Sequence, residues 1–250
     1  MPDALSGVLA TPGFWWLVLA YSVAGLVRGF TGFGTALIVM PVASTVLSPT
    51  AAVTVLVVSD LLGPLPNLPR AWRQGRPRDV LRLGIGAALA MPIGVWLLSR
   101  IPSEVFSWMV SLGVFALLAL LMSGWRYNGV LTRRLTVVTG ALGGLLGGAS
   151  GLAGPPVILL YMASPLPAAA IRATILMFLF VMDVMILGVL SLSGLIASGA
   201  VIAGLALAVP YTICNVIGAR FFVPDREGLF RAVAYTIIAA SALLGLPVWS

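Results

Sequence analysis

Two glycine-rich clusters are the first parts of this sequence that could do chemistry. One runs Gly29-Phe-Thr-Gly-Phe-Gly34, and the other runs Gly147-Gly-Ala-Ser-Gly-Leu-Ala-Gly-Pro-Pro156. Glycine accepts positive φ angles and lets a ligand approach the backbone closely. Successive free amides in such a turn form an anion-binding nest. The clusters therefore predict anion sites built from main-chain N–H groups.

Polar side chains in and near the clusters could complete such sites. Thr31 and Ser150 offer hydroxyl donors, and Arg28 could present a bidentate fork to a carboxylate or sulfonate. Asn215 belongs to a polar strip that could line a cavity or form interhelical hydrogen bonds. The predicted substrate-binding residues are Arg28, Gly29, Thr31, Gly32, Gly34, Gly148, Ser150, Gly151, Gly154, Pro155 and Asn215.

Each of these residues also has a structural interpretation. Glycines at such spacings allow two helices to pack closely, without any role in binding. Arg28 could form a structural ion pair or extend to a membrane interface. Both interpretations stay open at the level of sequence.

Asp60 and Asp183 lie within long apolar segments. Carboxylates inside a membrane are often proton relays or ion-pair partners. Both residues are candidates for proton coupling, and Asp60 could instead simply neutralise Arg28.

The residue types that are missing exclude several chemistries. The chain has no His, and its 14 basic residues are all Arg, so it has no Lys. Histidine bases, histidine metal sites and lysine Schiff bases are therefore impossible. The motif Gly148-Ala-Ser-Gly151 resembles the GxSG of rhomboid proteases, but that serine needs a histidine base, so we reject this interpretation. We expect no catalytic residues, no metal, no cofactor and no enzymatic activity.

Composition identifies the kind of element that carries these residues. Hydrophobic residues make up 60% of the chain and charged residues 8%, against about 25% charged in a typical globular protein. The sequence predicts one all-α transmembrane domain over residues 1–250. Its net charge of +7 comes from arginines in short loops, which points to lipid headgroups and not to nucleic acid. Long apolar segments are expected near 50–68, 80–99, 104–124, 167–190, 195–217 and 228–247, and the polar stretch from Pro66 to Arg82 is expected to be a loop.

Two further apolar regions, 14–46 and 135–164, are interrupted by the glycine clusters. Each arm, at about 14 residues or roughly 20 Å, is expected to be too short to cross roughly 30 Å of hydrocarbon. Each region is therefore predicted to be a broken helix or a re-entrant hairpin.

The two halves of the chain resemble each other. A shift of 119 residues places Gly25, Gly29 and Gly32 on Gly144, Gly148 and Gly151, and a shift of 118 places Pro92 on Pro210. This predicts internal repeats, approximately 14–124 and 135–247, each with four hydrophobic elements of which the first is broken.

Arginine placement favours inverted over parallel repeats. With re-entrant first elements, nearly all loop arginines fall on one side and Arg100 alone on the other, as the positive-inside rule requires. The arginines on the predicted inner side are Arg70, Arg73, Arg76, Arg78, Arg82, Arg126, Arg133, Arg134, Arg172, Arg220, Arg226 and Arg231.

The sequence resembles the TauE/SafE family, also called the sulfite exporter or toluene-sulfonate uptake permease family. The resembling residues are Gly25-Leu-Val-Arg-Gly-Phe-Thr-Gly-Phe-Gly34 with Pro41, Gly143 to Pro156, and Arg172-Ala-Thr174. Phe33, Thr35 and Asp183 depart from the family pattern.

The resemblance implies a multi-pass carrier in the bacterial inner membrane for small organic or sulfur-containing anions such as sulfite, sulfonates or sulfoacetate-like compounds. We expect alternating access, with the anion bound between the two broken-helix tips. The alternatives are an anion channel and a membrane-embedded enzyme. A homodimer is a further expectation for a carrier of this size.

Overall fold

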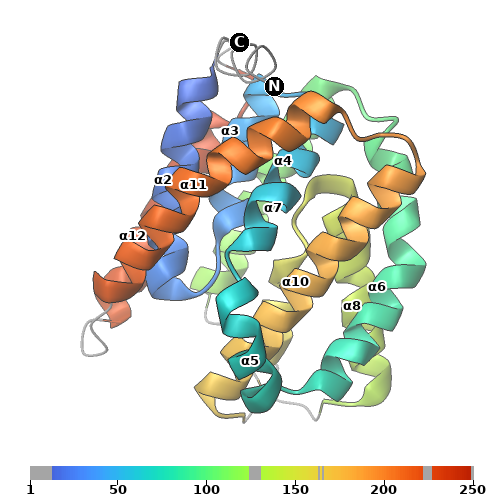
Figure 1. The fold of residues 1–250 in the computed structure, drawn as a ribbon, viewed down its shortest axis with the longest axis vertical. Helices are drawn as coiled ribbons and strands as arrows, with labels where there is room; N and C mark the ends of the chain where they lie inside the picture. The colour runs from blue at the N-terminus through green and yellow to red at the C-terminus, as the bar shows by residue number, and fades with distance from the viewer. Residues whose placement is uncertain (1–12, 124–130, 163, 165, 222–226, 249–250) are drawn as a thin grey trace.

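The protein is a bundle of helices (Figure 1). The computed structural model describes residues 13–123, 131–162, 164, 166–221 and 227–248. The first half contains α2 (Phe14–Thr31), α3 (Thr35–Val46), α4 (Pro49–Leu62), the 3₁₀ turn η1 (Leu65–Asn67), α5 (Leu68–Gln74), α6 (Pro77–Leu98) and α7 (Ser103–Met122). The second half contains α8 (Arg133–Ser150), α9 (Gly154–Met162), α10 (Ala168–Leu192), α11 (Ser198–Phe221) and α12 (Glu227–Leu244).

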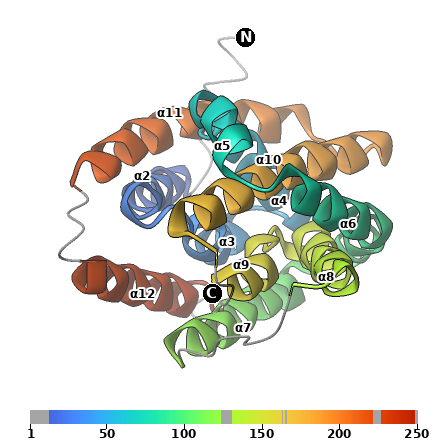
Figure 2. The same cartoon turned by 90° about the horizontal axis from the view of Figure 1, so that it is seen from below.

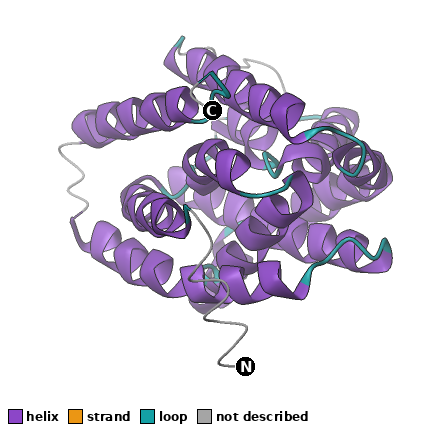
Figure 3. Cartoon of the chain, turned by 90° about the horizontal axis from the view of Figure 1, so that it is seen from above, coloured by secondary structure: helices purple, strands orange, loops and turns teal. Residues whose placement is uncertain are grey.

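Long apolar helices confirm the predicted membrane class. Five helices in the described chain are long and apolar enough to span a bilayer, namely α2, α6, α7, α10 and α11. In Figure 3 the described residues form helices and loops, with no strand. The chain is therefore an all-helical membrane protein.

Exposed apolar stripes show which surfaces face lipid. On α6, every fourth residue from Leu81 through Ile85, Leu89 and Ile93 to Leu97 is an exposed aliphatic side chain. Residues at this spacing share one helix face. Such a face would be costly in water and is ordinary in hydrocarbon.

Both predicted helix breaks are present. α2 ends at Thr31 and α3 begins at Thr35, while α8 ends at Ser150 and α9 begins at Gly154. Gly32, with φ 81°, and Gly151, with φ 74°, are the left-handed residues that terminate the two long arms. Glycine is the residue that adopts this conformation without a steric penalty.

The expected arm lengths were wrong. α2 and α8 each have 18 residues, or roughly 27 Å, whereas α3 has 12 residues and α9 has 9. Each region thus has one long and one short arm, because the left-handed glycine follows the centre of the apolar region.

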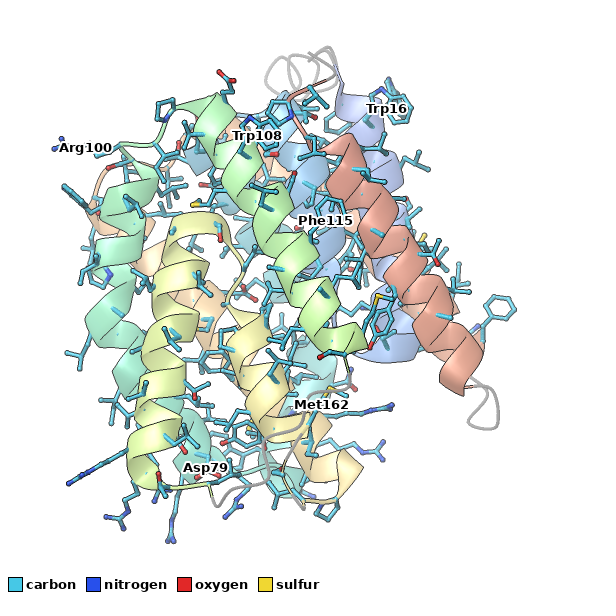
Figure 4. All side chains as sticks on the ribbon, turned by 180° about the vertical axis from the view of Figure 1, so that it is seen from behind. Trp16, Asp79, Arg100, Trp108, Phe115 and Met162 are labelled. Carbon is cyan, nitrogen blue, oxygen red and sulfur yellow. The ribbon has the colours of Figure 1, made fainter. Side chains whose placement is uncertain are left out.

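Each broken region folds back on itself. A Cβ built on Gly13, just before α2, would lie 3.0 Å from the γ carbons of Val46 at the end of α3. The start of α2 and the end of α3 are therefore close together. In Figure 4, Trp16 of α2 lies at the same end of the molecule as Arg100, whereas Met162 at the end of α9 lies at the end with Asp79. The two hairpins, α2–α3 and α8–α9, therefore open toward opposite ends.

The segment after the first hairpin differs from its prediction. The apolar stretch 50–68 is not one helix, because α4 ends at Leu62 and the chain continues through η1. Pro64 and Pro66 lack N–H groups and cannot continue the α-helical ladder. The predicted loop from Pro66 to Arg82 was also wrong, since it contains α5 and the start of α6.

The short arms lie near the middle of the bundle, where α3 and α9 are neighbours in the view of Figure 2. α2 packs against α11 and α8 packs against α6, so each long arm contacts a helix from the other half of the chain. Of the arginines used to predict topology, Arg126 and Arg226 lie outside the described residues, as does the side chain of Arg231.

Candidate functional site

A small cavity lies where the two hairpin tips meet. Its volume is about 40 Å³, and its walls come from α2, α3, α4, α9 and α10 together with both tips. The residues that line it are Arg28, Phe33, Gly34, Thr35, Ala36, Leu37, Leu56, Asp60, Gly151, Ala153, Gly154, Pro155, Ile158, Leu179, Asp183 and Ile186. The predicted meeting of the two clusters at one cavity is thus present in the structure.

Three residues that line the cavity, Arg28, Thr35 and Asp60, belong to a closed ring of hydrogen bonds that Tyr211 completes. Arg28 Nη1 contacts both carboxylate oxygens of Asp60 and donates to Thr35 Oγ1 at 3.0 Å. The Tyr211 hydroxyl donates to Asp60 Oδ1 and lies 3.0 Å from Thr35 Oγ1. Since the Tyr211 proton goes to Asp60, the Thr35 hydroxyl donates to Tyr211 and accepts from Arg28.

The ring joins four helices and balances one positive against one negative charge. Arg28 is on α2, Thr35 on α3, Asp60 on α4 and Tyr211 on α11. Arg28 and Asp60 are each 8% exposed. A buried pair is tolerated where the charges are matched and hydrogen-bonded. Of the two roles left open for Asp60, the ion pair with Arg28 is present in the structure.

Residues that line the cavity keep hydrogen-bond donors that the ring does not use. All the hydrogen bonds that Arg28 makes with described residues use Nη1, which leaves Nε and Nη2 as unused donors. The first intrahelical bond of α3 is from the Ile38 amide to the Gly34 carbonyl, at 3.2 Å. The amides of Thr35, Ala36 and Leu37 thus have no partner inside α3, and all three residues line the cavity.

The second tip is chemically different. α9 begins Gly154-Pro155-Pro156, and the two prolines have no N–H to offer. Cavity donors are therefore concentrated on the first hairpin. The second hairpin contributes shape, through Gly151, Ala153 and Pro155.

Asp183 of α10 also lines the cavity. It is 8% exposed, and its Oδ2 has no hydrogen-bond partner among the described residues. It is close enough to Asp60 and Arg28 to interact with both electrostatically. The two candidate coupling carboxylates therefore share one cavity, with different surroundings.

Two predicted hydroxyl donors are occupied elsewhere. Thr31 Oγ1 donates to the Val27 carbonyl at 2.8 Å and to the Phe33 carbonyl at 2.7 Å. Ser150 Oγ donates to the Leu146 carbonyl at 2.8 Å. Neither residue lines the cavity, and both hydroxyls satisfy the end of their own helix.

Three other predicted residues lie in helix contacts. A Cβ on Gly29 would fall 2.3 Å from the Asn215 carbonyl oxygen of α11, and one on Gly148 would fall 2.7 Å from the Met91 carbonyl oxygen of α6. The packing interpretation therefore describes Gly29, Gly148 and the Asn215 backbone. Gly32 is exposed, has no atom near its Cβ position, and serves the turn by its positive φ.

Of the predicted binding and coupling residues, those that line the cavity are Arg28, Gly34, Gly151, Gly154, Pro155, Asp60 and Asp183. Thr35 and the apolar wall formed by Leu56, Leu179 and Ile186 were absent from the prediction. The position of Thr35 directly after Gly34 was a usable signal, because the first residues of a helix that follows a break face the same space as the break. The apolar wall had no signal, since aliphatic residues occur throughout the chain.

The fold and the site define a class: a multi-pass helical membrane protein with a charged cavity between two helical hairpins. The profile of the family described as "Sulfite exporter TauE/SafE" matches residues 17–244. The chain belongs to this family of membrane transporters, as its glycine clusters predicted.

A curated relative agrees with this assignment. The chain is 29% identical over 228 residues to a protein of Cupriavidus necator named "Probable sulfite/organosulfonate exporter TauE". That match covers 88% of this chain and 89% of the relative. No solved structure matches the chain significantly.

Proposed function

We propose that this protein carries small organic or sulfur-containing anions, such as sulfite or organosulfonates, across the bacterial inner membrane. The observation that carries the proposal is the cavity between the hairpin tips, where Arg28 and the α3 amides present unused donors. Helix N-termini and guanidinium groups both favour oxyanions. The name of the Cupriavidus relative supports the same substrate class.

The cavity size favours a carrier over a channel. A volume of about 40 Å³ leaves room for only a few water molecules. A pore would need continuous space across roughly 30 Å of hydrocarbon. An organosulfonate would fit only after the tips move apart, as in a carrier that alternates between states.

Related packing in the two halves supports an inverted repeat. α2 contacts α11 through Gly25 and Gly29, and α8 contacts α6 through Gly144 and Gly148. α6 and α11 each contain an internal proline, Pro92 or Pro210. With hairpins that open toward opposite ends, such repeats could exchange conformations and so expose the cavity alternately to each side.

Flux through purified protein in liposomes tests the proposal. We expect saturable uptake of radiolabelled methanesulfonate or sulfite, accelerated by unlabelled anion on the opposite side. Unsaturable flux without this acceleration would favour a channel, and turnover of a lipid or peptide would favour an enzyme. Absence of anion flux in a folded preparation would contradict the proposal.

A tip variant locates the site. Gly151→Val places a branched side chain at a left-handed residue, where even a Cβ would lie 2.8 Å from Leu56. We expect this variant to lose most of its flux. Gly188→Val is the control, because nothing lies within 4 Å of its Cβ position on α10. Undiminished flux in a well-folded Gly151→Val protein would contradict a role of the hairpin tips in transport.

A further inference from the structure

The unpartnered oxygen of Asp183 is the one feature of the cavity that anion binding by itself leaves unexplained. Asp183 is nine-tenths buried, lines the cavity, and has no donor for Oδ2 among the described residues. An ionised carboxylate without a donor is costly in such surroundings, and more so within a bilayer. A proton on the carboxyl removes that charge.

Asp60, unlike Asp183, has a hydrogen-bond donor at each carboxylate oxygen. Both of its oxygens accept from Arg28, and Oδ1 also accepts from Tyr211. These donors suit an ionised carboxylate, which neutralises Arg28. Asp60 is thus the fixed counter-charge of the ring, and Asp183 is the carboxyl that is free to take up and release a proton.

Among the described residues, Arg28 of α2 and Asp60 of α4 are the charged groups that act on Asp183. At the start of α6, Arg76 and Arg82 pair with Asp79, and the Arg76 amide donates to the Thr174 hydroxyl of α10. Thr174 is 183 − 174 = 9 residues earlier on α10, or roughly 13 Å along the axis. The cavity residues contributed by the α8–α9 hairpin are uncharged.

The charge count then decides what can bind. With both carboxylates ionised, Arg28, Asp60 and Asp183 sum to −1, which repels an anion in a poorly screened cavity. With Asp183 protonated the sum is zero, and the free donors of Arg28 and α3 can hold an anion. We propose that Asp183 binds one proton together with each anion, so that the carrier moves anion and proton in the same direction. This inference rests on the proposed function and specifies its coupling ion.

The wild-type protein tests this coupling without any mutation. Methanesulfonate is the probe, because sulfonates stay ionised across the working range, whereas sulfite itself titrates near neutral pH. We expect calorimetry in two buffers of different ionisation enthalpy to show about one proton taken up per sulfonate. Above the pH at which free Asp183 titrates, affinity should fall about tenfold per pH unit.

Several outcomes would overturn the inference. Sulfonate binding with no proton uptake and no pH dependence would contradict proton coupling but would agree with the proposed function. Binding that requires sodium ions, tested against choline, would replace the proton by a metal cation. Absence of binding by either sulfonate or sulfite at every pH would overturn the proposed function and this inference together.

Two matched substitutions assign the proton to its residue. Asp183→Asn keeps the shape of the side chain, and its sulfonate affinity should no longer vary with pH. Glu104→Gln makes the same chemical change at an exposed position on α7 and should keep the wild-type slope. A folded Asp183→Asn protein with the wild-type pH slope would contradict the assignment.

Discussion

At the scale of residues, the cavity is organised by one charged pair and the two hydroxyls that complete it. The side-chain oxygens of Thr35, Asp60 and Tyr211 all have hydrogen-bond partners, while Nε and Nη2 of Arg28 remain for a ligand. The ring therefore both tolerates a charge inside the membrane and presents part of it to the cavity. Substitutions that break the ring should therefore lower the stability of the protein.

Arg28→Met should be strongly destabilising, because it leaves Asp60 buried and ionised without its counter-charge. Loss of one partner of a buried pair costs about 3–5 kcal/mol in soluble proteins. Thermal unfolding in detergent measures the effect. The double variant Arg28→Met, Asp60→Asn should recover part of the loss, with an interaction energy of about 1–3 kcal/mol. Strict additivity of the two single effects would contradict the pairing.

The pairing of Arg28 with Asp60 could be anticipated, because a charge at membrane depth needs an opposite charge nearby and the chain offers few acidic residues. The contact between Thr35 and Tyr211 could not. It joins residues 176 positions apart, and it depends on how α3 and α11 lie in space. Thr31 looked the better hydroxyl by its position, but Thr31 caps the end of α2 instead.

At the scale of elements, glycine has two separate structural roles. Left-handed glycines end the long arms, and helical glycines let those arms approach their partner helices. On α8, Gly140, Gly144 and Gly148 would place Cβ atoms 2.1, 2.5 and 2.7 Å from the backbone of α6. The glycine clusters are visible in the sequence, but the role of each glycine is not. Which glycines end a helix and which allow close packing depends on the helix that lies opposite.

Gly144→Ala should therefore separate α8 from α6. The new Cβ would lie 2.5 Å from Ala87 backbone atoms, which cannot rotate away. Overpacking of this kind costs about 1–3 kcal/mol. Gly188→Ala adds the same methyl to α10 in open space and should be neutral or stabilising by up to about 1 kcal/mol, through helix propensity. Equal unfolding temperatures for the two variants would argue against close packing here.

Helix lengths show a second limit of sequence reasoning. The breaks at residues 32–34 and 151–153 were predicted from glycine, and the long helices from apolar runs. The end of α4 at Leu62 was missed because the apolar run continues through Pro64 and Pro66. Hydrophobicity reports burial in lipid or protein, whereas the end of a helix depends on backbone hydrogen bonds.

At the scale of the whole molecule, arginines are concentrated at one end. α5 lies at the end that carries Asp79, and Arg76 and Arg82 pair with Asp79 itself (Figures 1 and 4). Arg100 lies at the opposite end, over the ring of Trp96. The positive-inside rule therefore predicts that the Asp79 end faces the cytoplasm.

Cysteine labelling checks this orientation. In a Cys214→Ser background, Arg100→Cys should react with an impermeant maleimide on intact spheroplasts. Gln74→Cys, exposed at the end of α5, should react only after permeabilisation. The reverse pattern would invert the topology and weaken the case for inverted repeats.

The central claim is that an anion occupies the cavity between the hairpin tips, and ligand protection tests it most directly. In the same cysteine-free background, Ala36→Cys places a thiol in the cavity wall, and Ala170→Cys places a half-buried thiol on α10 outside it. We predict that methanesulfonate slows N-ethylmaleimide modification of Ala36→Cys in a saturable manner and leaves Ala170→Cys unaffected. Equal rates at Ala36→Cys with and without a sulfonate that the protein binds would place the anion elsewhere and contradict the account.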